Sequence, residues 1–221
     1  MFHVKHLIFF LILIPSCTFS QGSMQLEDKP FSLSLPRNSK IDSFLSKYPS
    51  LQEFSSDEQD VIYWVNVLRN DPPGFKKQVI LPFLSVFPEA NTNYAKSLLQ
   101  DLEKQSPLQL IEPSISLRKE TQKHAKDLGL HQKNISHSSS DGRSFQQRMN
   151  DAGVSKCAGE NILEGKKDAL KAVIMLLIDQ GVPDKGHRKA LLNADFNLMA
   201  CSIFPKKNSE NFIHVQLFSC R

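Results

Sequence analysis

Several features that mark common protein classes are scarce in this 221-residue chain. It has only four cysteines and nine glycines, and no two cysteines have the Cys-x-x-Cys spacing typical of a structural zinc site. The excess of basic over acidic residues is only four, which is too small to indicate nucleic-acid binding. Hydrophobic residues make up 40% and charged residues 23%, so the chain has the composition of a globular protein.

Long hydrophobic runs are also lacking. The run Leu7–Ile14 is far shorter than the ~20 apolar residues that a transmembrane helix needs. Because a basic residue precedes the run, we predict a secretory signal peptide over residues 1–20, cleaved after Ser20. The alternative is cleavage at Cys17, in a segment similar to a lipobox, which would anchor the protein through a lipid. The expected location is secreted or extracytoplasmic in either case.

The remaining cysteines limit the disulfides that can form. Without Cys17, the chain keeps Cys157, Cys201 and Cys220. Three cysteines in an oxidising compartment allow at most one intramolecular disulfide and leave one thiol. The sequence does not determine which pair forms.

Composition divides the rest of the chain into two parts. Residues 21–55 are rich in Ser, Pro, Lys and Gln, which predicts a linker or N-terminal arm with one short helix near Ile41–Lys47. Apolar residues at helical spacing begin at Ser56, so we expect one domain over residues 56–221.

Helical patterns dominate the middle of this domain, and strand patterns its end. A first helix, capped by Ser56 and Gln59, should end before Asp71, and residues 75–110 are expected to be helical in part. Further helices are predicted over Ser114–Leu130, Ser144–Ala152 and Ala169–Ile178. Leu198–Phe204 and Phe212–Ser219 predict a hairpin of two strands. This order of elements indicates an α+β fold.

Four side chains could carry chemistry. His137 and His187 lie in turn-rich segments, Glu160 begins an apolar run, and Asp179 ends an apolar helix. Two imidazoles and two carboxylates can bind a divalent metal, or can pair as a base and the group that orients it. The spacing alone does not bring these four residues together.

The order of several motifs carries a resemblance to a known family. They are the opening helix Val61–Arg69, His124 and its neighbours followed by Ser136-His137-Ser138, then Gly159-Glu160-Asn161-Ile162, and Gly186-His187-Arg188. Together they resemble the CAP superfamily of cysteine-rich secretory, antigen 5 and pathogenesis-related 1 proteins, also called SCP-like extracellular domains. The segment around His187 is similar to a microbial subgroup.

The resemblance implies an α-β-α sandwich with a small antiparallel sheet between helices. It also implies a cleft in which His137 and His187 bind a divalent metal, most simply zinc. Glu160 and Asp179 stand beside the metal as the catalytic carboxylates. The first three residues follow from the motifs. Asp179 follows only by alignment with a position that is usually Glu.

The function implied is an extracellular binding module for a protein, glycan or lipid ligand, with a cleft able to hold a divalent metal. One alternative is a metal-assisted hydrolase of peptide or glycan with Glu160 as base, and another is a lipid or sterol carrier. Whether the chain is an enzyme stays open, because activity is not general in the family. No nucleic-acid partner and no transmembrane span are expected.

Overall fold

The computed structural model describes residues 26–27, 29–131, 134–154 and 157–221. The predicted signal peptide, its cleavage site and Cys17 lie outside the described residues. Within the described part of the chain, no helix has both the length and the apolar character needed to cross a membrane.

Helices are the most frequent elements of the described chain. They are α1 (Ser39–Leu45), α2 (Ser56–Asn70), α3 (Pro72–Phe75), α4 (Leu81–Val86), α5 (Asn93–Lys104), α6 (Ile115–His131), α7 (Phe145–Asp151), α8 (Ala169–Ile178) and α9 (Gly186–Leu191). Short helical turns η1 (Pro49–Glu53), η2 (Lys76–Ile80) and η3 (Pro88–Ala90) connect some of them. The strands are β1 (Glu112–Pro113), β2 (Ala158–Gly165), β3 (Leu198–Pro205) and β4 (Phe212–Ser219).

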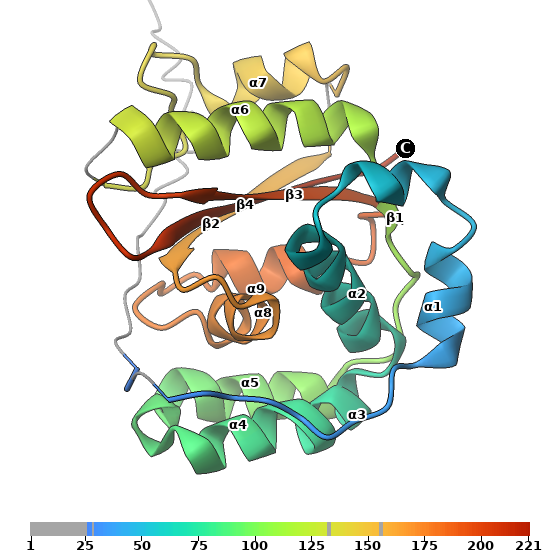
Figure 1. The fold of residues 1–221 in the computed structure, drawn as a ribbon. Coiled ribbons are helices and arrows are strands. Elements are labelled where there is room, and N and C mark those ends of the chain that lie inside the picture. The colour runs from blue at the N-terminus through green and yellow to red at the C-terminus, as the bar shows by residue number, and fades with distance from the viewer. Residues whose placement is uncertain (1–25, 28, 132–133, 155–156) are drawn as a thin grey trace, which may run out of the picture.

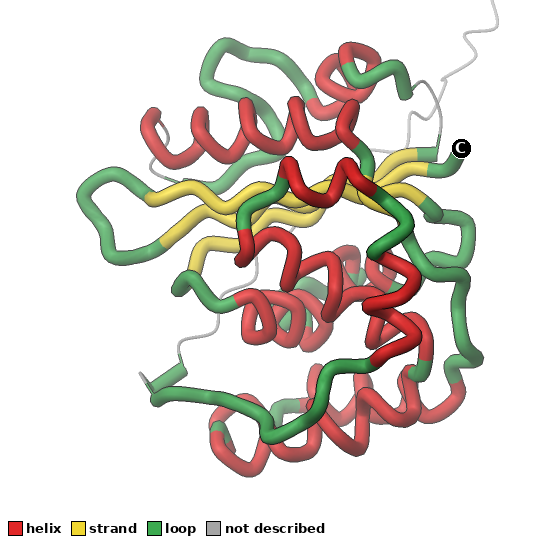
Figure 2. Tube along the Cα trace, turned by 45° about the vertical axis from the view of Figure 1, so that its right-hand side comes forward, coloured by secondary structure: helices red, strands yellow, loops and turns green. Residues whose placement is uncertain are grey.

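The elements form three layers around one sheet (Figure 1). Helices α6 and α7 cover one face, and α2, α8 and α9 cover the other, while α3 to α5 lie beyond α8. The tube in Figure 2 shows the sheet edge-on between its two helical layers. The predicted α+β class and α-β-α sandwich are confirmed.

The sheet has the strand order β1-β3-β4-β2, so β2 is an edge strand. The predicted hairpin is present as the antiparallel pair β3 and β4, and β2 pairs antiparallel with β4 along all eight of its residues. Glu160 lies opposite Leu217, and Asn161 lies opposite Gln216. Because successive side chains of a strand point to opposite faces, neighbouring residues of β2 point toward different helical layers.

Two sequence predictions differ from the structure in detail. The first helix begins at Ser56 as predicted, but its capping box joins Ser55 and Glu58 instead of Ser56 and Gln59. Residues 29–55 are packed more firmly than a loose arm, since Ile41, Leu45 and other side chains from this segment are buried in the main core. Their apolar residues are too sparse in sequence to show helical spacing.

His214 of β4 is a buried titratable group outside the candidate site. Its Nε2 lies 3.0 Å from the carbonyl oxygen of Lys166, which can only accept, so Nε2 carries a proton and donates it. The other ring nitrogen has no partner among the described residues. Burial lowers the pKa of His214 to about 4, although Asp168 and Asp57 oppose the shift.

Acid should therefore destabilise the fold through His214. The unfolded chain binds a proton below the ordinary pKa of 6.5, whereas the folded chain binds it only near pH 4. Stability is full above pH 6.5 and falls by about 3 kcal/mol as the pH drops to 4. Urea unfolding at pH 7 and pH 4 checks this by comparison with His214→Gln. An equal loss in the variant and the wild type would contradict it.

Candidate functional site

His137 lies in the loop between α6 and α7 and is bound by Glu160 of β2. Its Nδ1 is 2.8 Å from Oε1 of Glu160. Since an ionised carboxylate can only accept, the imidazole donates, and a neutral ring then carries its lone pair on Nε2. The Glu160 side chain is 1% exposed and the His137 side chain 18%. The carboxylate is thus hidden, while part of the imidazole reaches the surface.

Arg148 of α7 is the cation that allows Glu160 to be buried as an anion. The arginine is fully buried, and it donates to both carboxylate oxygens of Glu160, at 2.7 and 2.9 Å. Burial alone would raise the pKa of Glu160, but hydrogen bonds from His137 and Arg148, and the arginine charge, outweigh it and hold that pKa below its ordinary value. Arg148 also donates to the carbonyl oxygen of His137 at 2.9 Å, which fixes the backbone of the histidine.

The loop that carries His137 is also attached to α6. His124, which is buried, bonds through Nε2 to the carbonyl oxygen of Ser136 at 2.9 Å and through Nδ1 to the hydroxyl of Ser139 at 3.3 Å. Burial lowers the pKa of His124, so the ring is neutral near pH 7. Asp127 accepts a hydrogen bond from the backbone N–H of Ser140 at 2.7 Å. These contacts hold both flanks of His137 in place.

His187, at the start of α9, forms a second histidine–carboxylate pair. Its Nδ1 is 2.7 Å from Oδ1 of Asp179, and the other carboxylate oxygen accepts from the backbone N–H of Arg188 at 3.0 Å. The Asp179 side chain is completely buried and the His187 side chain is 17% exposed. Asp179 follows α8 in the left-handed conformation (φ 59°), which directs the chain back toward α9.

Two arginines hold α9, the helix that carries His187. Arg188 is buried and donates to five oxygens, among them the carbonyls of Leu177 and Ile178 at the end of α8. Arg69 of α2 donates to the carbonyls of Leu191 and Asn193 at the other end of α9, at 3.0 and 2.9 Å. The position of His187 is therefore set by buried charges instead of loop packing alone.

The two pairs meet at strand β2. Glu160 points to the α6–α7 layer, where Arg148 holds it, and its neighbour Asn161 points to the α8–α9 layer. There the side-chain amide of Asn161 donates to the carbonyl oxygen of His187 at 3.4 Å. One pair thus lies on each face of the sheet at the same edge strand.

Comparison with known proteins shows the family of this chain. The family model described as "CAP: Cysteine-rich secretory protein family" matches residues 63–220, which is well over half of the chain. The chain belongs to the CAP family. This confirms the resemblance seen in the sequence motifs. A search of curated proteins with this chain gave no match.

Three solved structures illustrate the similarity of this CAP domain to others. An extracellular SCP-domain protein from Bacillus anthracis is 19% identical, with 75% of this chain and 40% of that chain covered and a TM-score of 0.47. An outer surface protein from Borrelia burgdorferi is 23% identical (58% and 89% covered, TM-score 0.43). Venom allergen-like protein 4 from Schistosoma mansoni is 13% identical (76% and 90% covered, TM-score 0.45). The chain spans less than half the length of the Bacillus protein, and none of the three assigns a role to a residue here.

The side chains of the two histidine–carboxylate pairs bear on the predicted metal. Searching the described residues gives no group of three or more His, Cys, Asp or Glu side chains placed to hold one ion. The two carboxylates are bound to imidazoles, to Arg148 and to a backbone N–H, so two imidazoles are the remaining protein ligands. Two protein ligands are fewer than the four that close a structural zinc site, and a metal at this place stays a prediction.

These contacts also bear on the predicted catalytic role of Glu160 and Asp179. A base that takes a proton from water must reach that water, and both carboxylates are buried behind the histidines. Their contacts instead orient the imidazoles and fix the proton on Nδ1. The sequence did not single out Arg148, on which the Glu160 pair depends. Nothing in the segment Phe145–Asp151 marks this arginine as buried.

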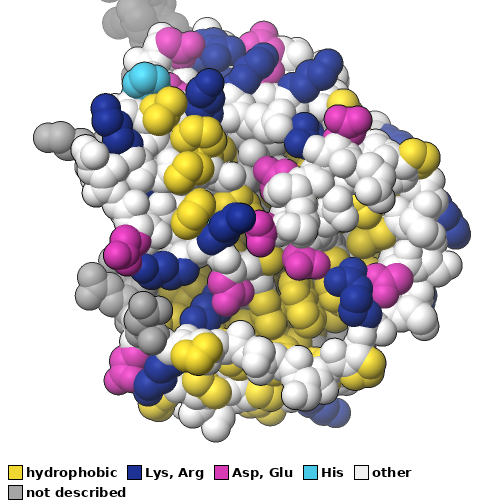
Figure 3. All heavy atoms as spheres, in the orientation of Figure 1, with side chains coloured by type: hydrophobic (Ala, Val, Ile, Leu, Met, Phe, Trp, Pro, Cys, Tyr) yellow, Lys and Arg dark blue, Asp and Glu magenta, His cyan; other side chains and the backbone are white. Residues whose placement is uncertain are grey.

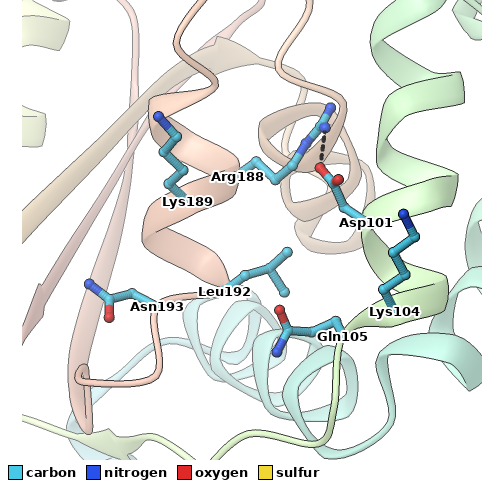
Figure 4. A pocket seen from close by; sticks show the side chains of 7 residues that line it. All are labelled: Asp101, Lys104, Gln105, Arg188, Lys189, Leu192 and Asn193. Carbon is cyan, nitrogen blue, oxygen red and sulfur yellow. Dashed lines mark hydrogen bonds and ion pairs between the residues drawn. The ribbon is translucent and has the colours of Figure 1, made fainter.

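Two other surface features lie outside the two histidine–carboxylate pairs. An open pocket of about 450 Å³ between α5 and α9 includes none of the four predicted site residues (Figure 4). Arg188, which lines this pocket, is bonded to Asp101 and uses its guanidinium donors in five hydrogen bonds. Lys104 and Lys189 also line the pocket. Hydrophobic side chains also gather in the lower half of the face in Figure 3, at the level of α8 and α2 and above α4. Lipid carriage remains a prediction that nothing here tests.

Proposed function

We propose that this CAP domain is an exported, extracellular binding module whose ligand site is the edge of β2 between His137 and His187. The observation that carries the proposal is that each imidazole is partly exposed and held by a buried carboxylate, one on each face of the same strand. Such a carboxylate fixes the proton on Nδ1, as it does in many histidines that bind a metal through Nε2.

Export is supported by the disulfide between Cys157 and Cys220, whose Cα atoms are 5.6 Å apart. Disulfides persist in oxidising compartments and are rare in the cytosol. The relatives named as extracellular or outer-surface proteins agree with this location. In this proposal His137 and His187 hold a divalent ion, zinc by preference, and the ion offers its remaining positions to water or to a ligand oxygen.

Zinc titration followed by calorimetry tests the metal part of the proposal. We expect one zinc per chain, with affinity reduced at least tenfold in His137→Ala and in His187→Ala, because each removes one of two protein ligands. His131→Ala is the matched control, since His131 lies at the exposed end of α6 and should leave the affinity unchanged. Equal zinc affinity in all four proteins would contradict the metal site.

A further inference from the structure

The sheet register determines which main-chain groups of β2 face away from β4. The N–H of Cys220 donates to the carbonyl oxygen of Cys157 at 3.2 Å, so the odd-numbered residues of this segment are the ones bonded to β4. Antiparallel ladders alternate, and the N–H and C=O groups of the even-numbered residues therefore point outward. These residues are Ala158, Glu160, Ile162 and Glu164.

The outward main-chain groups are recessed but unpaired. Among the described residues, none forms a hydrogen bond with the backbone of these four positions. Glu160 as a whole residue is 9% exposed although its side chain is only 1% exposed, so the surface it shows is mostly main chain. Ile162 is 3% exposed. Main-chain donors and acceptors at this depth are stable only when water or another chain bonds to them.

The opposite edge of the sheet, along β3, is blocked by the chain itself. Strand β1 pairs with Leu198 and Met199, and the carboxylate of Glu58 accepts from the outward N–H of Ile203 at 3.2 Å. Pro205, at the end of the same edge, has no N–H to offer. Proteins commonly block edges in these ways to prevent strand addition. The described part of the chain thus closes one edge and leaves the other open at the candidate site.

We propose that the open edge of β2 binds an extended peptide segment of a partner protein, which adds to the sheet as a fifth strand. Strand addition uses main-chain hydrogen bonds for affinity and alternate side chains for specificity. The inference rests on the binding-module function and names the class of its ligand. Because the edge is recessed, a single extended chain reaches it, whereas the strand edge of a second folded copy does not.

The surroundings of β2 define the side chains that such a peptide carries. On the α6 face, Ile162 belongs to a small apolar cluster, against which Ile135 packs while partly buried. A peptide residue on that face beside Ile162 is therefore apolar. The peptide residues on either side of it lie near His137 on the same face or near His187 on the other face. We expect these peptide residues to have polar side chains that can form a hydrogen bond with an imidazole.

Amide hydrogen exchange measured by NMR on the whole chain tests the premise without a ligand. We expect the outward amides of Glu160, Ile162 and Glu164 to exchange at least tenfold faster than those of Asn161, Leu163 and Gly165. Equal protection of both sets in dilute protein would overturn the proposal, because the edge would already be occupied. Protection that increases with protein concentration would also overturn it, since the occupant would be a second copy.

The ligand itself is tested with a display library of random linear 12-residue peptides. Selected peptides should protect the three outward amides, and N-methylation at alternate peptide residues should weaken binding at least tenfold while methylation between them does not. Peptides that bind without protecting these amides, or a library that gives no binder, would overturn the proposal. If peptide binding persists in His137→Ala and His187→Ala, the edge site stands and the imidazole role fails.

Two variants of Glu164 test whether an outward N–H of β2 contributes to peptide binding. Glu164→Pro removes an outward N–H without touching the β2–β4 ladder, because proline is tolerated on an edge strand. Glu164→Ala loses the same side chain, including its contacts with Lys206 and Asn211, but keeps the N–H. We expect selected peptides to bind at least tenfold more weakly to the proline variant than to the alanine variant, and equal binding would overturn the proposal.

Discussion

Replacing Arg148 with methionine is expected to lower the free energy of unfolding by about 3–5 kcal/mol, since it leaves the Glu160 carboxylate buried without its cation. The arginine is fully buried and makes two hydrogen bonds to Glu160 and one to the backbone of His137. The pKa of Glu160, now held below its ordinary value, should rise, because burial then acts with less opposition. Chemical denaturation at pH 7 measures the loss.

The double variant Arg148→Met with Glu160→Gln separates charge from packing. A neutral amide needs no buried cation, so the double variant should be more stable than Arg148→Met alone, by at least about 1 kcal/mol. If the second substitution destabilises the protein further, the arginine acts through its packing, and the electrostatic account of the Glu160 pair is wrong. The NMR signals of His137 should also shift in Arg148→Met, because its carbonyl contact is lost.

Elements that form between residues close together in the sequence were predictable. Helix α8 spans Ala169–Ile178, as its nearly continuous apolar run predicted, and the β3–β4 hairpin follows from two strand patterns joined by a polar loop. Strand β2 was not predicted, because its sequence Ala-Gly-Glu-Asn-Ile-Leu-Glu-Gly shows neither alternation nor a dense β-branched run. Its pairing with β4, a segment about fifty residues away, makes it a strand.

The candidate site was predictable only as three motif positions and one aligned position, Asp179. His137, Glu160, Asp179 and His187 were named from the sequence, and the structure joins them in two pairs. Arg148, the buried arginine that holds the Glu160 pair, leaves no sequence signal, because an arginine in a short polar helix usually faces solvent. Tertiary contacts determine which side chains bond to one another, how deeply they are buried and in which direction each pKa shifts. The spacing of residues along the sequence does not reveal these contacts.

The disulfide should contribute nearly as much stability as the Arg148 pair. Cys157 stands directly before β2 and Cys220 directly after β4, and the bond closes a loop with a sequence separation of 63 residues. Chain-entropy arguments give about 4 kcal/mol for a loop of this length. Reductant should therefore lower the unfolding free energy of the wild type by roughly this amount.

The third cysteine supplies the control for this measurement. Cys201 is a buried free thiol, and burial raises its pKa well above the ordinary value, so it is a poor thiolate nucleophile. Reductant should lower the stability of Cys201→Ala as much as that of the wild type and should leave Cys157→Ser/Cys220→Ser unchanged. Because the bond fixes the end of β2 next to the recessed edge, reduction should also speed exchange of the Asn161 amide. A reductant effect that disappears in Cys201→Ala would mean that a different cysteine pair carries the stabilisation.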